Sequence, residues 1–166
     1  RWGRSVDLGY FPKDSTAFFQ TNMNLVDWLR QYSKDPDEQF VRGFLGRMLF
    51  SGDEAKKSAN VLSGGEKVRC MLSRLMLQSP NVLLLDGPTN HLDLESITAL
   101  NNGLLKYESP MIFASHDVQF VTSLANRVLE LGKDKWFDLG ITFEQYLADP
   151  ARLARVGKVA PGQSAA

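Results

Sequence analysis

Apolar and polar residues alternate over residues 5–11, where Val6, Leu8 and Tyr10 are separated by polar or small residues. A two-residue period is typical of a strand with one buried face, so we expect a short strand here. Pro12 should end it, because proline has no amide hydrogen to donate to a strand ladder.

Helical spacing follows, with three helices predicted before residue 80. Asn24 can cap the first, and Asp35, followed by a proline, is the expected N-cap of the second. The apolar residues of the second helix fall on one face, and they are Phe40, Val41, Phe44, Leu45 and Met48. The third begins at Ser63, which has capping-box spacing to Glu66, and should stop at Ser79 before a proline.

The second half of the chain alternates short apolar runs with helical stretches. Short continuous apolar runs are typical of strands buried on both faces. The predicted strands are residues 82–85, 111–114 and 128–131, with helices around 97–104 and 120–124 and a closing strand and helix over 136–147. Strand–helix alternation implies an α/β fold, with a parallel sheet and helices packed against it.

The charge balance and the single cysteine exclude or disfavour several classes of function. The 166 residues contain 19 Lys and Arg and 19 Asp and Glu, so the formal net charge is zero. This balance disfavours a strongly basic nucleic-acid module. The single cysteine, Cys70, excludes an internal disulfide framework and a multi-cysteine zinc site. No apolar run approaches the ~20 residues of a membrane-spanning helix, and the chain begins with Arg1, which suggests a fragment of a longer protein.

Three polar clusters suggest a nucleotide site. In open parallel sheets, ligands bind beyond the carboxyl ends of the strands, where Asp86 and His116 are expected. Ser63, Gly64 and Gly65 open a helix whose exposed N–H groups could receive a phosphate. A strand-end carboxylate suits hydrated Mg²⁺, and a nearby histidine could bond a phosphate oxygen. Taken singly, each cluster is more often an ordinary cap or turn.

The wording and order of four segments resemble those of ATP-binding-cassette (ABC) ATPases. The matching segments are residues 62–67 for the signature motif, 81–86 for the Walker B strand, 88–93 for the turn and D-loop, and 115–117 for the switch histidine. Glu-Lys after the two glycines, Asn-His-Leu-Asp at residues 90–93, and residues 45–53 look most like the ABC-F branch. The resemblance covers residues 5–147.

The resemblance implies a fold and partners. The fold would be a partial P-loop-type ABC cassette, with a parallel-sheet core and a helical subdomain that carries the signature motif. Its parts would be residues 1–13 (end of the N-terminal β part and Q-loop), 14–80 (helical subdomain), 81–147 (ATP-binding core) and 148–166 (flexible tail). ABC-F proteins are cytoplasmic, have two cassettes and no membrane domain, and act on the ribosome, so a second cassette and the ribosome or its RNA are the implied partners.

The resemblance also implies cofactors and residue roles, with ATP and Mg²⁺ as the ligands. Ser63, Gly64 and Gly65 would contact the γ-phosphate of an ATP held mainly by the opposite cassette, and the ATP-binding set would also include Glu66, Asp93 and Lys13. Asp86 would hold Mg²⁺ through water, Asp93 would cross the cassette interface, and His116 would sense the γ-phosphate. We expect the glycine-capped helix and the Asp86 strand to face the same triphosphate, supplied by a neighbouring lobe.

Three departures suggest a slow or degraded cassette. The phosphate loop, Gly-x-x-x-x-Gly-Lys-Ser/Thr, is missing, because Gly-Lys at residues 132–133 and 157–158 lacks the following Ser or Thr. Gly87 stands where the family has a catalytic glutamate, and losing such a group typically costs ~10²–10⁴-fold in rate. Alternatively, Gly87 merely eases the turn. Lys13 aligns with the Q-loop glutamine, and it could pair with phosphate but cannot ligate a metal.

Other functions remain open. The C-terminal lobe of a DNA-repair or chromosome ATPase also carries a signature motif without a phosphate loop, but a long coiled coil precedes it and residues 1–60 show no heptads. A transporter ATPase subunit more often has glutamine at the position of Glu66. A module that uses ATP only to dimerise, or uses no nucleotide, is favoured by Gly87 and Lys13.

Overall fold

The structure is a computed structural model that describes residues 3–132 and 135–152. The chain forms two compact units, Arg1–Asp117 and Val118–Ala166, and each is described by itself. Of the predicted flexible tail, residues 153–166 lie outside the described residues. So do Lys133 of the first Gly-Lys pair and both residues of the second pair.

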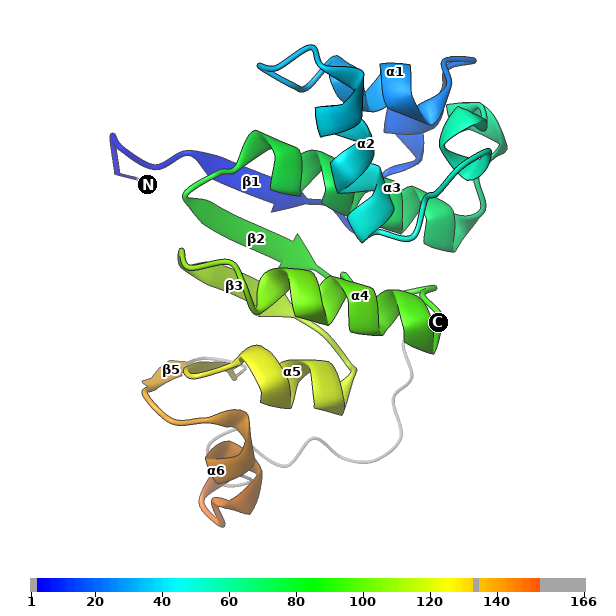
Figure 1. Ribbon diagram of the computed structural model, residues 1–166. Coiled ribbons are helices and arrows are strands. Elements are labelled where there is room, and N and C mark those ends of the chain that lie inside the picture. Colours follow the sequence, from blue (N-terminus) through cyan, green and yellow to red (C-terminus); the bar gives the residue numbers. More distant parts are fainter. Residues whose placement is uncertain (1–2, 133–134, 153–166) are drawn as a thin grey trace. The chain divides into compact units, whose positions relative to one another are not determined.

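A three-stranded parallel sheet forms the centre of the first unit (Figure 1). Its strands are β1 (Leu8–Phe11), β2 (Val82–Asp86) and β3 (Met111–Ala114), and β2 lies in the middle. Phe11 is paired with Leu85, and Leu85 with Phe113, so all three strands end at the same edge. The parallel α/β core expected from the sequence is therefore confirmed, although β1 begins at Leu8, later than predicted.

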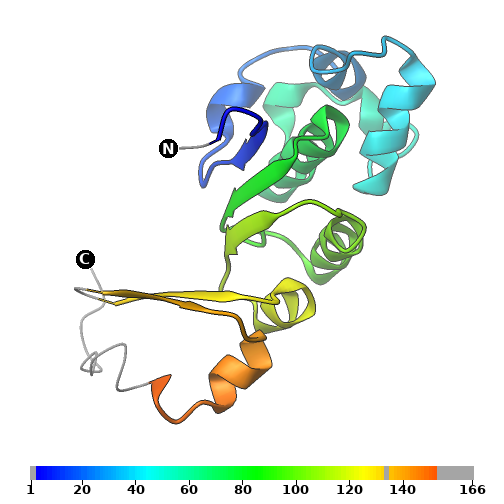
Figure 2. The same cartoon turned by 90° about the vertical axis from the view of Figure 1, so that its left-hand side faces the viewer.

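Helices α3 (Gly64–Gln78) and α4 (Leu94–Leu104) cover one face of this sheet (Figures 1 and 2). Leu83 and Leu85 of β2 are buried, whereas Val82 and Leu84 are half-buried and Asp86 is exposed. Ile112 of β3 is 42% exposed. The expectation that residues 111–114 form a strand buried on both faces is therefore wrong, because β3 alternates between half-buried and exposed residues.

Between β1 and α3 the chain forms a helical layer. Its elements are η1 (Thr16–Phe19), α1 (Leu25–Arg30), α2 (Glu38–Arg47), η2 (Glu54–Lys56) and η3 (Ala59–Val61). Trp28 anchors the layer: its ring stacks on Phe19 with 4.8 Å between centroids, and its Nε1–H donates to the carbonyl of Phe18 at 2.8 Å. Buried apolar residues of α1, α2 and α3 complete this core.

Helix α2 begins later than predicted. Asp37, not Asp35, is its N-cap, and its carboxylate accepts from the Gln39 N–H at 2.8 Å. The Asp35 carboxylate instead accepts from the Asp37 N–H at 3.0 Å and closes a turn before the helix. Asp35 and Asp37 are both suitable N-cap residues, and the sequence does not show which of the two hydrogen-bonding patterns forms.

The second unit contains α5 (Val118–Leu124), β4 (Val128–Leu131), β5 (Trp136–Leu139) and α6 (Phe143–Ala148). β4 pairs antiparallel with β5 in a separate two-stranded sheet. The prediction that residues 128–131 extend the parallel sheet is therefore wrong. The short connection to β5 permits a hairpin, whereas a parallel partner needs a crossover. The predicted closing strand and helix are confirmed as β5 and α6.

Candidate functional site

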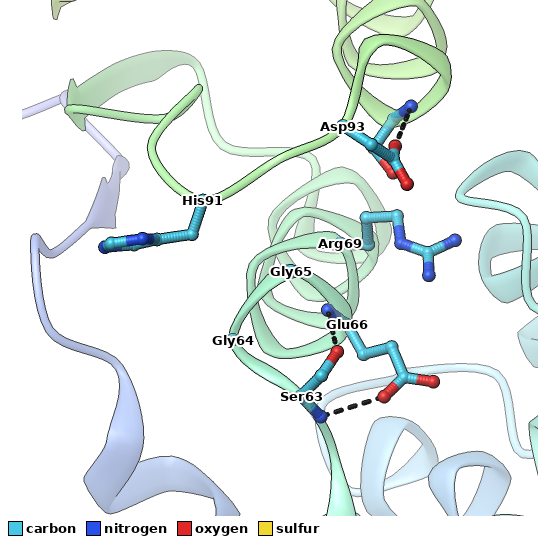
Figure 3. A pocket seen from close by; sticks show the side chains of 8 residues that line it. Ser63, Gly64, Gly65, Glu66, Arg69, His91 and Asp93 are labelled. Atoms are coloured by element: carbon cyan, nitrogen blue, oxygen red, sulfur yellow. Dashed lines mark hydrogen bonds between the residues drawn. The ribbon is translucent and has the colours of Figure 1, made fainter.

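The start of α3 is a capped helix terminus with two glycines in its first turn. The Ser63 hydroxyl accepts from the Glu66 N–H at 3.3 Å, and the Glu66 carboxylate accepts from the Ser63 N–H at 2.8 Å (Figure 3). The first bond back along the helix runs from the Lys67 N–H to the Ser63 carbonyl. The N–H groups of Gly64 and Gly65 precede that bond, so they are the donors that this terminus can direct at an anion.

Gly65 packs against the loop that leads from β2 to α4. A Cβ on residue 65 would lie 3.0 Å from the backbone carbonyl oxygen of His91. His91 itself has a left-handed backbone, with φ +63°. This close approach favours glycine at residue 65 and brings the residue 91–93 loop onto the start of α3.

The two segments enclose a pocket of about 430 Å³. Its lining residues are Ser63, Gly64, Gly65, Glu66, Arg69, His91, Asp93 and Ser96. In Figure 3 the Glu66 and Arg69 side chains lie on one side of the helix start and the His91 ring points the other way. The pocket thus combines backbone donors with both signs of side-chain charge, which suits a polyphosphate more than an apolar ligand.

Asp93 is the N-cap of α4, and its carboxylate accepts from the Ser96 N–H at 2.8 Å. Hydrogen bonds from Ser96 lower the pKa of Asp93, and the nearby Arg69 guanidinium acts in the same direction. Arg69 is held in place by its contact with the Phe50 ring, 4.9 Å from the centroid, and by a 3.3 Å bond to the Met48 carbonyl. The carboxylate expected to cross a cassette interface therefore sits beside a fixed cation.

Glu66 is ionised despite its low exposure. Partial burial of the carboxyl group raises its pKa, but hydrogen bonds from Lys57 and from Ser63 outweigh this and hold the pKa of Glu66 at about 2. The Lys57 Nζ lies 2.8 Å from Glu66 Oε1. The pocket rim therefore carries a carboxylate that is already paired with a lysine.

A second group of predicted residues lies at the carboxyl edge of the parallel sheet. Asp86 is the last residue of β2, while Lys13 and His116 follow β1 and β3 by two residues each. All three are exposed. The Thr89 and Ser115 hydroxyls, 2.8 Å apart, join the turns that follow β2 and β3. This edge is where an open parallel sheet binds ligands.

Asp86 fits the magnesium that the resemblance implies. It presents an exposed carboxylate at the strand end. Across the part of the chain that the structure describes, no three His, Cys, Asp or Glu residues gather into a metal cage. Mg²⁺ is commonly held through one or two carboxylates, waters and substrate phosphates, and does not need such a cage.

The backbone conformation of Gly87 favours glycine over residues that carry a Cβ. Its φ is +60°, and a Cβ there would lie 2.3 Å from Nδ2 of Asn90. Its N–H donates to the Ala114 carbonyl, and its carbonyl accepts from the Asn90 N–H. Gly87 therefore makes a tight turn after β2 that is hydrogen-bonded to the end of β3, and it offers no carboxylate to an attacking water.

The structure separates the predicted residues into two groups. The pocket gathers Ser63, Gly64, Gly65, Glu66 and Asp93, and it does not include Lys13, Asp86, Gly87 or His116. The lining of this pocket does not include Asp86, and the expectation that the glycine-capped helix and Asp86 face one triphosphate stays a prediction. Beside Gly65, the pocket is bounded by the residue 91–93 loop, which packs against the start of α3.

Three pocket residues were missed by the sequence analysis: Arg69, His91 and Ser96. Arg69 lies three residues after Glu66, so helical spacing alone places both on one face. Ser96 lies three residues after the Asp93 cap, where its amide hydrogen meets the cap carboxylate. Nothing in the spacing of His91 indicates its left-handed backbone.

Comparison with known proteins decides the family. The ABC transporter family model matches residues 4–90, slightly more than half of the chain. The chain belongs to the ABC transporter family. The match includes the start of α3, β2 and the turn at Gly87. Part of each group of site residues therefore lies in the region that matches the ABC family model.

Two relatives and one solved structure illustrate the similarity. The uncharacterized ABC transporter ATP-binding protein YkpA of Bacillus subtilis is 58% identical over 89% of this ABC chain. ATP-binding cassette sub-family F member 3 of Rattus norvegicus is 32% identical over 87% of it. A crystal structure of the complex of archaeal ribosomal stalk protein aP1 and archaeal ribosome recycling factor aABCE1 matches 89% of the chain with a TM-score of 0.70 and 22% identity, which shows the fold.

The chain is much shorter than these proteins. It spans 28% of YkpA, 20% of the rat protein and 31% of the matched structural chain. None of the helices within residues 3–132 and 135–152 is long and apolar enough to cross a membrane.

Proposed function

We propose that this ABC chain supplies the signature side of an ATP site in a two-cassette ABC-F-type ATPase. One observation carries the proposal: the start of α3, with the Gly64 and Gly65 donors, lines a pocket together with Asp93. Helix termini with exposed N–H groups bind phosphate. A second cassette would bring ATP on its own phosphate loop, and the Ser63 hydroxyl and the two glycines would meet its γ-phosphate.

The second group of residues would serve a different ATP. Asp86 would hold Mg²⁺ through water, and His116 would contact a γ-phosphate, at the carboxyl edge of the sheet. The phosphate loop for this site would come from a part of the protein outside the 166 residues. The separation of the pocket from Asp86 supports two half-sites, each completed by another segment.

A role in translation, in the cytoplasm, is the cellular part of the proposal. It is supported by the 32% identity to sub-family F member 3 and by the wording Glu-Lys and Asn-His-Leu-Asp in the two motifs. The ribosome or its RNA would be the partner of the closed, ATP-bound form.

Hydrolysis at the half-site that contains Gly87 would be slow. The tight turn at this residue offers no carboxylate to activate water, and Lys13 would pair with phosphate in place of a metal ligand. The same observations favour a second candidate, a module that uses ATP only to hold the cassettes together. The two candidates differ in turnover and agree in ATP binding.

The test uses a two-cassette protein that carries this chain. We expect it to bind ATP, and we expect Gly64→Val to abolish ATP-dependent closure measured by small-angle scattering. Steady-state ATP turnover separates the two candidates, since the ATPase predicts slow phosphate release and the module predicts none. A Gly64→Val protein that closes with ATP like the wild type would contradict the proposed site.

A further inference from the structure

Glu66 poses an electrostatic problem for the site just proposed. A helix start attracts phosphate through its N–H groups and its positive dipole end, and a carboxylate in the same turn opposes that attraction. The Glu66 carboxylate is fixed there, because it accepts from the Ser63 N–H at 2.8 Å. Its side chain is 15% exposed, so solvent screens its charge only partly.

Lys57 supplies the compensating charge. Its Nζ lies 2.8 Å from Glu66 Oε1, and its second carboxylate neighbour, Glu54, is farther away at 3.7 Å. The hydrogen bond to Glu66 raises the pKa of Lys57 and lowers that of Glu66, so both groups are charged at neutral pH. Glu66 thus binds Ser63 through one oxygen and Lys57 through the other.

The backbone around Lys57 is held independently of this ion pair. The Lys57 carbonyl accepts from the Leu25 N–H at 3.1 Å, and the Ala59 N–H donates to the Met23 carbonyl at 2.8 Å. Asn24 and Ser58 form a β-bridge between the same two segments. The lysine therefore projects toward α3 from a backbone that is anchored on the start of α1.

We propose that Lys57 is a positioning residue of the ATP site, which cancels the charge of the Glu66 carboxylate and holds that carboxylate on the Ser63 N–H. This inference rests on the proposed function, since it concerns the phosphate that the start of α3 would receive. Without Lys57, the incoming γ-phosphate meets an uncompensated negative charge in the first turn of the helix.

A different role for the pair would be purely mechanical, as a clamp between α3 and the segment before it. The two roles differ in a double variant. If the pair is a clamp, removing both partners is at least as harmful as removing one. If the pair cancels charge, replacing Glu66 with glutamine removes the charge that Lys57 balances, and glutamine keeps the capping box.

The experiment measures ATP binding and turnover in the two-cassette protein for the wild type, Lys57→Met, Lys57→Arg, Lys57→Met with Glu66→Gln, and Lys56→Met. Lys56 is the matched control, because it neighbours Lys57 and forms its own exposed pair with Asp53 at 2.8 Å. Lys57→Met should weaken ATP binding and raise KM about three- to tenfold without changing kcat, as expected for a lost unit charge near a partly screened site.

We expect Lys57→Arg to bind ATP within about twofold of the wild type, since it keeps the charge. The double variant should recover most of the loss caused by Lys57→Met. Wild-type affinity in Lys57→Met, or a double variant as weak as that single variant, would overturn the inference while leaving the proposed function intact. Failure of the wild type to bind ATP would overturn both.

Discussion

The carbonyl oxygen of His91 lies 3.0 Å from the position that a Cβ on Gly65 would occupy. The first turn of α3 and the loop before α4 therefore pack backbone against backbone at this point. Real Cβ atoms rarely approach a backbone oxygen so closely, and a carbonyl cannot rotate away as a long side chain can.

Gly65→Ala should therefore push the start of α3 away from the residue 91–93 loop, the two segments that line the pocket. We expect it to lower the free energy of unfolding by about 1–2 kcal/mol, in the range of overpacked sites, and to weaken ATP-dependent closure. Urea unfolding followed by tryptophan fluorescence measures the first effect.

Gly43→Ala is the matched control for this variant. Nothing lies within 4 Å of a Cβ at residue 43 in α2, so alanine should stabilise the helix by about 0.5–1 kcal/mol. Equal responses of Gly65→Ala and Gly43→Ala would show that the contact with His91 has no energetic consequence.

Gly87→Ala should destabilise the turn after β2. Its φ of +60° alone costs an L-residue about 1–2 kcal/mol, and the Cβ would also meet the Asn90 amide. Gly52→Ala is the comparison, because Gly52 has φ +53° with nothing within 4 Å of its Cβ. We expect Gly87→Ala to lose at least as much unfolding free energy as Gly52→Ala, and a smaller loss would contradict the turn geometry described here.

The pH dependence of stability should report the Glu66 carboxylate. Its pKa is about 2 in the folded chain and about 4.3 in an unfolded one. Because the folded value is the lower, the stabilisation is present above about pH 4.5 and is lost as the pH falls toward 2.

The difference in unfolding free energy between the wild type and Glu66→Gln isolates this group. It should be largest near pH 6 and shrink between about pH 4.5 and 2. Carbon-detected NMR titration of Glu66 gives the same pKa directly, and Lys57→Met should raise it. A titration midpoint at the ordinary value for glutamate would disprove the pairing with Lys57.

Trp28 should be more sensitive to substitution than Trp136. It is 1% exposed, and Trp28→Phe removes the bond from its Nε1–H to Phe18 and part of its stacking on Phe19. We expect a loss of about 1–3 kcal/mol in unfolding free energy. Trp136→Phe, at a residue that is 66% exposed, should change it by less than about 0.5 kcal/mol. Equal losses in the two variants would contradict the assignment of Trp28 to the core.

Several elements could be predicted from the sequence because their causes are local. The cap at Ser63, the α3 stop at Ser79 and the strand over residues 82–85 each depend on a few neighbouring residues. Asp86 and His116 were placed at strand ends for the same reason. Which site roles these residues fill is still a prediction.

Other features depended on partners far away in the sequence. Residues 128–131, in which Glu130 stands among three apolar residues, indicate a strand, but the hairpin with β5 decided its partner and direction. β3 alternates between half-buried and exposed residues, and within residues 3–132 and 135–152 it pairs with β2 alone, which its own residues could not reveal.

The sequence by itself determined the local starts and stops of the elements and the order of the motifs, because capping bonds and side-chain periodicity act within a few residues. Only the tertiary structure decided that Gly65 meets His91, and that His91 lines a pocket with the start of α3. Those relationships depend on how the loop after β2 packs on α3, and that packing is fixed by contacts between residues more than twenty positions apart.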